Sequence, residues 1–349
     1  MSAARAGRRR LSASVLAIAA LLAVVAACSG GGDDASTDTS APTTTTTVAM
    51  TTTVPLPLPT YPLTGLTRDD PAKATRPGTV VKIENSSKSQ GRQRGVTLAD
   101  VVYVEKVEGG ITRLATVFHS TDAEAVGPVR SARTTDVVLT ANLNRPLFAY
   151  SGANAGVLRQ IRGANLVDLG RDTRPDMYNG QGILGVFTST PTLYGAAPDP
   201  PSGPPGPLFV YGPTPPGAPA TGATASYGSM VDTKVRWETW EGGWMRSQDG
   251  AAHVDQAGAR VGAANVVFQM VEYRDSGFRD ITGAASPEAV LLGEGDVLVL
   301  TGGRLVPGRW SRAAPGDVTT LTTATGRPLA LQPGRTWVEL VPQGSVAPL

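Results

Sequence analysis

Two arginines three residues apart, Arg130 and Arg133, have the type and spacing that most directly indicate chemistry in this sequence. They follow a Gly-Pro turn, and the apolar residues after them predict a helix from about Ser131 to Asn144. Free backbone N–H groups at a helix start favour an anion, and two guanidinium groups on one face would strengthen such a site. We therefore predict an anion-binding site made of Arg130, Ser131 and Arg133, with Arg113 as a further ligand-binding candidate.

The same two arginines have a structural interpretation as well. They could pair with Glu105, Glu108 or Asp136 and hold the fold together. We also predict a polar cluster of Glu84, Asn85, Glu105 and Glu108. Because Glu105 and Glu108 are an odd number of residues apart, they would face opposite sides of one regular strand, so we do not expect a catalytic carboxylate pair there.

Other residue sets that support catalysis are missing from the sequence. His119 and His253 are its two histidines and Cys28 is its one cysteine, too few for a structural zinc site with four such ligands. A serine triad would need a histidine base, and no Gly-x-Ser-x-Gly elbow is present. The sequence also lacks a phosphate-binding loop and a dinucleotide fingerprint. We therefore expect no metal, no cofactor and no identified catalytic residue.

The charge of the chain gives no indication of a nucleic-acid partner. The formal net charge is +2, but the first 27 residues hold four of the 31 Lys and Arg and none of the 29 Asp and Glu. From Cys28 onward the chain is therefore formally −2. A slightly acidic chain argues against a basic surface built for nucleic acid.

The N-terminus has the layout of a secretory signal peptide. Arginines at its start precede an apolar run over 11–27, and small residues stand just before Cys28. This arrangement resembles a lipobox, which implies cleavage before Cys28 and modification of its thiol by a lipid carrying acyl chains such as palmitate. Several acyl chains give durable membrane binding. Residues 28–60 are rich in Ser, Thr and Pro and predict a disordered tether.

Beyond the tether, strands alternate with helices and predict an α+β fold. Val-rich stretches at 79–83, 100–108 and 111–120 predict strands, the last two joined by a Gly-Gly turn. Further strands are predicted in the second half, which also holds all five tryptophans. Those tryptophans could pack in the core or form a carbohydrate-stacking face, and packing is the more common role.

Several strings of residues in this region resemble the YerB-type lipoprotein family, whose core is domain of unknown function 3048. These strings are Glu84-Asn85, Leu98–Tyr103, Glu108–Arg113, Val126–Arg133, Arg246–Gly250 and Leu331–Trp337. The resemblance covers residues 65 to 342 and implies a surface lipoprotein with two domains. It carries no established catalytic residues. The chain departs from the family at 183–188, where many members have Pro-His-Asn and this sequence has neither the His nor the Asn.

Together these patterns predict four segments: a signal peptide at 1–27, a lipidated tether at 28–60, a mixed α/β domain at 61–212 and a smaller β-rich domain at 225–345. We expect a lipoprotein anchored on the extracytoplasmic face of the cell membrane. The favoured function is non-catalytic binding of an anionic cell-wall polymer or a partner protein. Two alternatives stay open: an envelope hydrolase using acids such as Glu84, Glu105 or Asp100, and a scaffold for a membrane protein.

Overall fold

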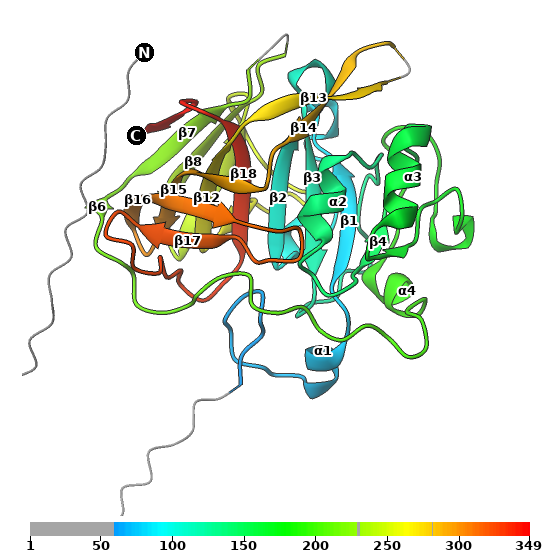
Figure 1. Ribbon diagram of the computed structural model, residues 1–349, viewed down its shortest axis with the longest axis horizontal. Coiled ribbons are helices and arrows are strands. Elements are labelled where there is room, and N and C mark those ends of the chain that lie inside the picture. The colour runs from blue at the N-terminus through cyan, green and yellow to red at the C-terminus, as the bar shows by residue number, and fades with distance from the viewer. Residues whose placement is uncertain (1–58, 229–230, 281) are drawn as a thin grey trace, which may run out of the picture. The chain divides into compact units, whose positions relative to one another are not determined.

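Strands from both halves of the sequence join one eleven-stranded sheet (Figure 1). The structure, a computed structural model, describes residues 59–228, 231–280 and 282–349. The predicted signal peptide, Cys28 and nearly all of the predicted tether lie outside these residues. The sheet has β6 (Ala218–Pro219) paired to β16, and its other strands follow in this order: β17 (Thr320–Thr323), β16 (Arg304–Arg312), β15 (Gly293–Thr301), β12 (Asn265–Val271), β18 (Thr336–Pro342), β2 (Val101–Lys106), β3 (Thr112–Phe118), β1 (Thr79–Glu84), β4 (Leu147–Ala149) and β5 (Val167–Asp168).

Strand β18 connects the two halves of the sequence. It comes from the last part of the chain and runs parallel to β12 on one side and to β2 on the other. The segments 61–212 and 225–345 therefore share one continuous set of backbone hydrogen bonds.

A second sheet and a separate hairpin complete the strands. The second sheet has β11 (Gly262–Ala263) paired to β9, with the order β10 (Ala251–Ala252), β9 (Gly243–Gln248), β8 (Lys234–Trp240), β7 (Gly222–Ser226) and β19 (Val346–Pro348). The hairpin consists of β13 (Tyr273–Arg279) and β14 (Ala285–Ala289). The predicted strands in both halves are confirmed, including the hairpin of β2 and β3.

Helices are few and short among the described residues. They are α1 (Pro71–Thr75), α2 (Thr135–Thr140), α3 (Ala155–Gly163) and α4 (Thr190–Tyr194). The α+β class holds in this coarse sense, but the first half is not clearly the α/β layer that the sequence predicts. There β1, β3 and β2 pair antiparallel with one another, and β4 runs parallel to both β1 and β5.

The sheet separates two apolar cores, and strand alternation determines which residues enter each. Val81 and Ile83 of β1 face a core shared with the second sheet, which contains Trp237 and Trp244. Val80 faces the other core, toward α2 and α3. Residues of even number on β1 therefore lie on the side of α2 and α3, where the charged site forms.

Helix α2 is much shorter than the predicted span of 131–144. Before it, the backbone N–H groups of Arg130 and Ala132 donate to carbonyl groups of Lys82 and Gly152, so this stretch is held extended against the ends of the sheet. After it, residues 144 and 145 adopt left-handed backbone angles that end the helix. The β-branched residues inside it also have weak helix propensity. In the described part of the chain, no helix has the length and apolar character that spanning a membrane requires.

Candidate functional site

A row of charged side chains crosses the sheet on the face that α2 covers. Glu84 of β1 lies directly opposite Arg113 of β3, and Arg113 in turn lies opposite Glu105 of β2. Lys82 precedes Glu84 by two residues and so shares its face. The register of three antiparallel strands thus gathers residues that are far apart in sequence.

Lys82 lies at the centre of this row and is fully buried. Its ammonium group donates to Glu105 and, at 2.7 Å, to Asp136 of α2. Burial and the neighbouring Asp136 raise the pKa of Glu105 to about 7, against the opposing charge of Lys82. The second carboxylate oxygen of Glu105 is buried without a hydrogen-bond partner in the structure. These three residues form a buried ionic core beneath the predicted arginine site.

Glu84 holds two of the predicted arginines. Its Oε2 accepts from Arg130 Nε at 2.6 Å and lies 3.4 Å from Arg113 Nη2. Burial opposes ionisation of Glu84, but the two guanidinium charges outweigh it and lower the pKa of Glu84. Burial and the nearby charge of Arg133 lower the pKa of Arg113 to about 10. Arg113 is almost fully buried, so it supports Glu84 from below and does not present a free surface.

Arg133 pairs with Glu108, as the structural interpretation of the sequence predicts. Its Nη2 and Nε lie 2.5 and 3.1 Å from Glu108 Oε2. Burial opposes ionisation of Glu108, but this pairing outweighs it and lowers the pKa. Glu108 lies in a one-turn 3-10 helix after β2 has ended at Lys106, so the alternation rule for a regular strand does not reach it.

Arg130, in contrast, has free hydrogen-bonding capacity. Its Nε is bonded to Glu84, and neither of its terminal nitrogens has a hydrogen-bond partner among the described residues. Its side chain is 25% exposed, compared with 3% for Arg113 and 12% for Arg133. Arg130 opens into a cavity of about 520 Å³, which we call the arginine groove, lined also by Ser131, Arg133, Asn154 and Arg279.

The predicted contribution of a helix start to this site is wrong. The N–H of Arg133 donates at 2.7 Å to Asp136 Oδ2, so the helix's own carboxylate occupies that donor. The hydroxyl of Ser131 donates to the carbonyl of Ser151 at 3.1 Å. Anion binding in the arginine groove would therefore depend on side-chain guanidinium groups.

Asn85, predicted in the same polar cluster, belongs to a different buried network. Its amide donates to Gln248 Oε1 at 3.0 Å, and Gln248 also accepts from Arg246 at 2.8 Å. Arg246 in turn binds Glu339 at 3.0 Å and donates to His253 Nδ1 at 2.9 Å. All five side chains are buried between the two sheets. This network joins the two halves of the chain and offers no opening to a ligand.

The remaining candidates for acid–base chemistry are enclosed. Asp100 is buried and accepts from the backbone N–H groups of His119 and Ser120 at 2.6 and 2.7 Å. His119 is fully buried, and neither ring nitrogen has a partner in the structure. Burial and nearby arginines lower the pKa of His119 to about 4. Among the described residues, no group of His, Cys, Asp and Glu is arranged to hold a metal ion.

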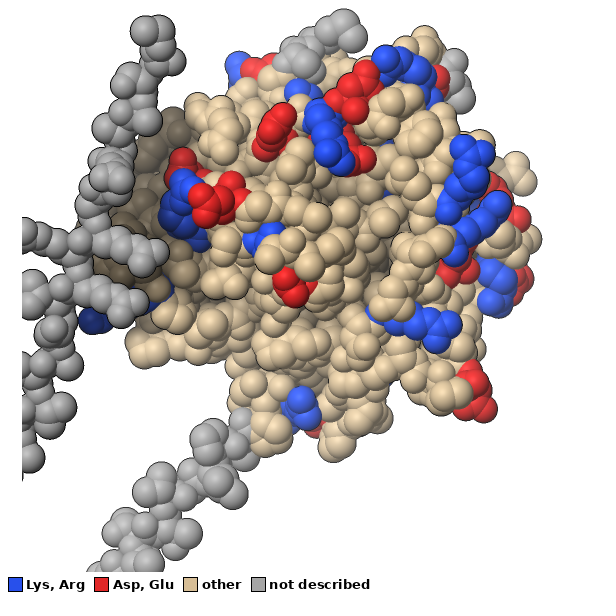
Figure 2. All heavy atoms as spheres, viewed as in Figure 1, with Lys and Arg blue, Asp and Glu red and all other residues tan. Residues whose placement is uncertain are grey.

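Lys82 and Asp136 are central members of the site that the sequence prediction did not include as ligand-site residues. A signal for Lys82 exists, since a lysine within the valine- and isoleucine-rich stretch 79–83 requires a partner if it is buried. On the face of the molecule shown in Figure 2, acidic and basic side chains are interspersed and form no continuous basic region.

Comparisons with known proteins agree with the resemblance noted in the sequence. Residues 63–193 match the N-terminal domain, and residues 223–338 the C-terminal domain, of the DUF3048 family of unknown function. The chain is 38% identical over 100 residues to a Bacillus subtilis (strain 168) protein described as "Putative lipoprotein YerB". That match spans 29% of this chain and 29% of the relative. The crystal structure of the YerB protein from Bacillus subtilis has the same fold, with a TM-score of 0.72 at 23% identity over 83% of this chain and 99% of that chain.

Proposed function

Because this chain belongs to the DUF3048 family, in which a relative is described as a lipoprotein, we propose that it is a membrane-anchored lipoprotein of the extracytoplasmic face that binds an anionic component of the cell envelope. Acylation of Cys28 would supply the anchor, and the arginine groove would supply the binding site. The observation that carries the proposal is Arg130, which is held by one nitrogen and open at the other two.

The arrangement around Arg130 suits reversible binding of an anion. The bond from Nε to Glu84 fixes the guanidinium plane, and Arg113 fixes Glu84 from the other side. A guanidinium that is already oriented loses less side-chain entropy when it binds a phosphate or carboxylate through two parallel hydrogen bonds. Arg133 and Arg279 add positive charge to the lining, while Asp280 and Glu108 limit it, so the groove favours a single anionic group over a dense polyanion.

The two alternatives have less support in the geometry. A hydrolase would need an accessible acid, but Glu84 is only 2% exposed, and Glu105 and Asp100 are at most 1% exposed. Each of the three is already bonded to cations or backbone N–H groups. A scaffold for a membrane protein would not require a partly unbonded arginine inside a cavity.

Binding of purified Bacillus subtilis wall fragments to the full chain in detergent tests the proposal. In Arg130→Gln we expect the dissociation constant to rise at least about tenfold, since a hydrogen bond to a charged group contributes about 1.5–3 kcal/mol and 1.4 kcal/mol is a factor of ten. Arg130→Lys keeps the charge without the fork and should fall between the two. Arg309→Gln, on the surface of β16 outside the groove, is the matched control.

The experiment also identifies the anion. Loss of binding when the fragments are stripped of phosphate-containing polymers would identify a phosphate ligand, and retained binding would identify a carboxylate ligand. Equal affinity for the wild-type chain and a folded Arg130→Gln variant would reject the arginine groove as the binding site.

A further inference from the structure

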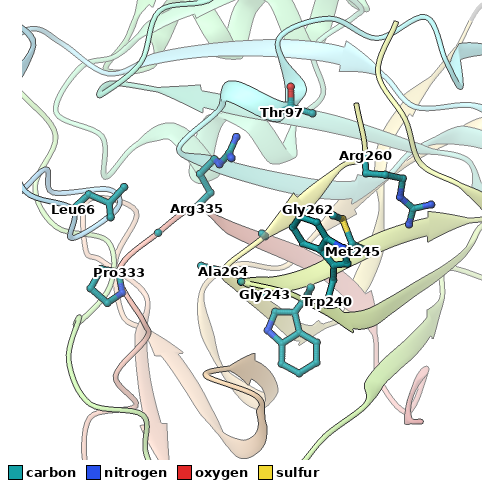
Figure 3. A pocket seen from close by; sticks show the side chains of 14 residues that line it. Leu66, Thr97, Trp240, Gly243, Met245, Arg260, Gly262, Ala264, Pro333 and Arg335 are labelled. Carbon is teal, nitrogen blue, oxygen red and sulfur yellow. The ribbon is translucent and has the colours of Figure 1, made fainter. Parts of the chain in front are cut away.

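A second cavity lies where the turn between β8 and β9 meets the loop before β18 (Figure 3). Its volume is about 660 Å³, within the range of small-molecule sites. We call it the tryptophan groove, and its lining includes Trp240, Arg260, Arg335, Gly243 and Gly334.

Trp240 differs from the other tryptophans of the chain. It is 60% exposed, whereas Trp237, Trp244, Trp310 and Trp337 are between 0% and 3% exposed. Those four residues confirm the packing role that the sequence favours for tryptophan. Trp240 contributes little to the core, and it lines the groove (Figure 3). It therefore provides a flat apolar surface at the groove edge.

The charged residues that line the tryptophan groove are both basic. Its lining includes Arg260 and Arg335 and contains no Asp or Glu. Arg260 donates to the backbone carbonyl of Arg246 at 3.0 Å. Arg335 has no side-chain hydrogen bond or ion pair among the described residues, although its carbonyl accepts from two backbone N–H groups. The arginine groove, by comparison, balances its arginines with Glu84 and Glu108.

Glycines keep part of the groove wall free of side chains. A Cβ on Gly243 would lie 2.3 Å from the carbonyl oxygen of Ala263, and one on Gly334 would lie 2.5 Å from Ala264 Cβ. Both glycines have positive φ, so close backbone packing already requires them.

We propose that the tryptophan groove binds a sugar ring carrying a phosphate or carboxylate group. The apolar C–H face of the ring would stack on Trp240, and the anionic substituent would bind Arg335, while Arg260 on the other side of the groove adds positive charge to the lining (Figure 3). A free inorganic anion would gain nothing from the indole, and a neutral sugar would gain nothing from the charge of Arg335. This site is separate from the arginine groove and does not depend on the function proposed for it.

The test measures calorimetric binding of three probes to the full chain in detergent: N-acetylglucosamine 1-phosphate, N-acetylglucosamine and inorganic phosphate. We expect the phosphosugar to bind at least about tenfold more tightly than either of the other two. Trp240→Ala should weaken phosphosugar binding at least about fivefold, as should Arg335→Gln, whereas Arg130→Gln and Arg309→Gln should leave it unchanged.

Different failures overturn different statements. No phosphosugar binding at 10 mM, or unchanged binding in a folded Trp240→Ala variant, would reject the site. Loss of binding in Arg130→Gln alone would place the ligand in the arginine groove and reject the tryptophan groove. Glucuronic acid as a fourth probe separates carboxylate from phosphate, and binding of either anionic sugar through Trp240 supports the proposal.

Discussion

Replacing Lys82 with methionine removes the cation that contacts both Glu105 and Asp136, and this change tests the buried ionic core most severely. The three side chains are fully buried. Removing one partner from a buried ion pair leaves an uncompensated charge and typically costs about 3–5 kcal/mol. We therefore expect Lys82→Met to lose about 3–5 kcal/mol of unfolding free energy at pH 8.

The loss of unfolding free energy in Lys82→Met should be smaller at pH 5 than at pH 8, because Glu105 takes up a proton between these two values. Its folded pKa is raised to about 7, so the folded protein takes up this proton between pH 8 and pH 5. Without Lys82 the pKa of Glu105 should rise further, so the variant gains more from acidification than the wild type does. Each unit of additional shift is about 1.4 kcal/mol. If the variant's pKa reaches about 8, the loss at pH 5 should be about 1 kcal/mol smaller than at pH 8, and about 1.4 kcal/mol is the largest difference this pH range allows.

Urea unfolding followed by tryptophan fluorescence measures both quantities, since four tryptophans are buried. In the double variant Lys82→Met/Glu105→Gln, the contribution of position 105 to the pH dependence of the unfolding free energy should disappear, because glutamine does not titrate. Lys234→Met is the matched control, because its side chain is 71% exposed and it should lose less than about 1 kcal/mol at either pH. A loss in Lys82→Met that is the same at pH 5 and pH 8 would refute the reasoning.

Further outcomes follow from other parts of the structure. Arg246→Met should cost about 3–5 kcal/mol in urea unfolding, because it strands the buried Glu339, whereas the exposed Arg236→Met should cost under about 1 kcal/mol. Burial and the charge of Arg246 hold the pKa of His253 well below its usual range. The NMR shifts of the His253 ring should therefore stay constant from pH 7.5 to 5.5. A titration of His253 in that range would show that its Nδ1 does not accept a hydrogen bond from Arg246. Gly222→Ala should lower the unfolding free energy by about 1–3 kcal/mol, because the added Cβ would lie 2.0 Å from the carbonyl oxygen of Trp237. In Gly163→Ala the added Cβ meets no atom within 4 Å, so this control should be neutral or stabilising. Equal unfolding midpoints for the two variants would contradict this prediction.

The strands of this protein could be predicted from sequence because they are local patterns. Valine-rich stretches gave β1 and the hairpin of β2 and β3, and alternation gave β8. The pairing of β18 with β2 could not be predicted, because it joins residues over 230 positions apart and no local signal specifies a partner. The expectation of an α/β layer was not clearly met for the same reason.

The site shows the same division between local and distant information. The pairing of Arg133 with Glu108 was among the predicted alternatives, since both residue types and their nearness to turns are visible in the sequence. The role of Asp136 as an acceptor for Lys82 depends on how α2 packs on β1, and this packing is not visible in the sequence. The separation of Asn85 from Glu84 follows from strand β1 ending at Glu84, after which the chain turns toward the second sheet.

A crystal structure of the full chain with a phosphate- or carboxylate-bearing wall fragment, at a concentration near the measured dissociation constant, would test the central claim most directly. The proposed function predicts an anionic group within hydrogen-bond distance of both terminal nitrogens of Arg130, with the bond from Arg130 Nε to Glu84 retained. An anion bound elsewhere, with only solvent at Arg130, would contradict it.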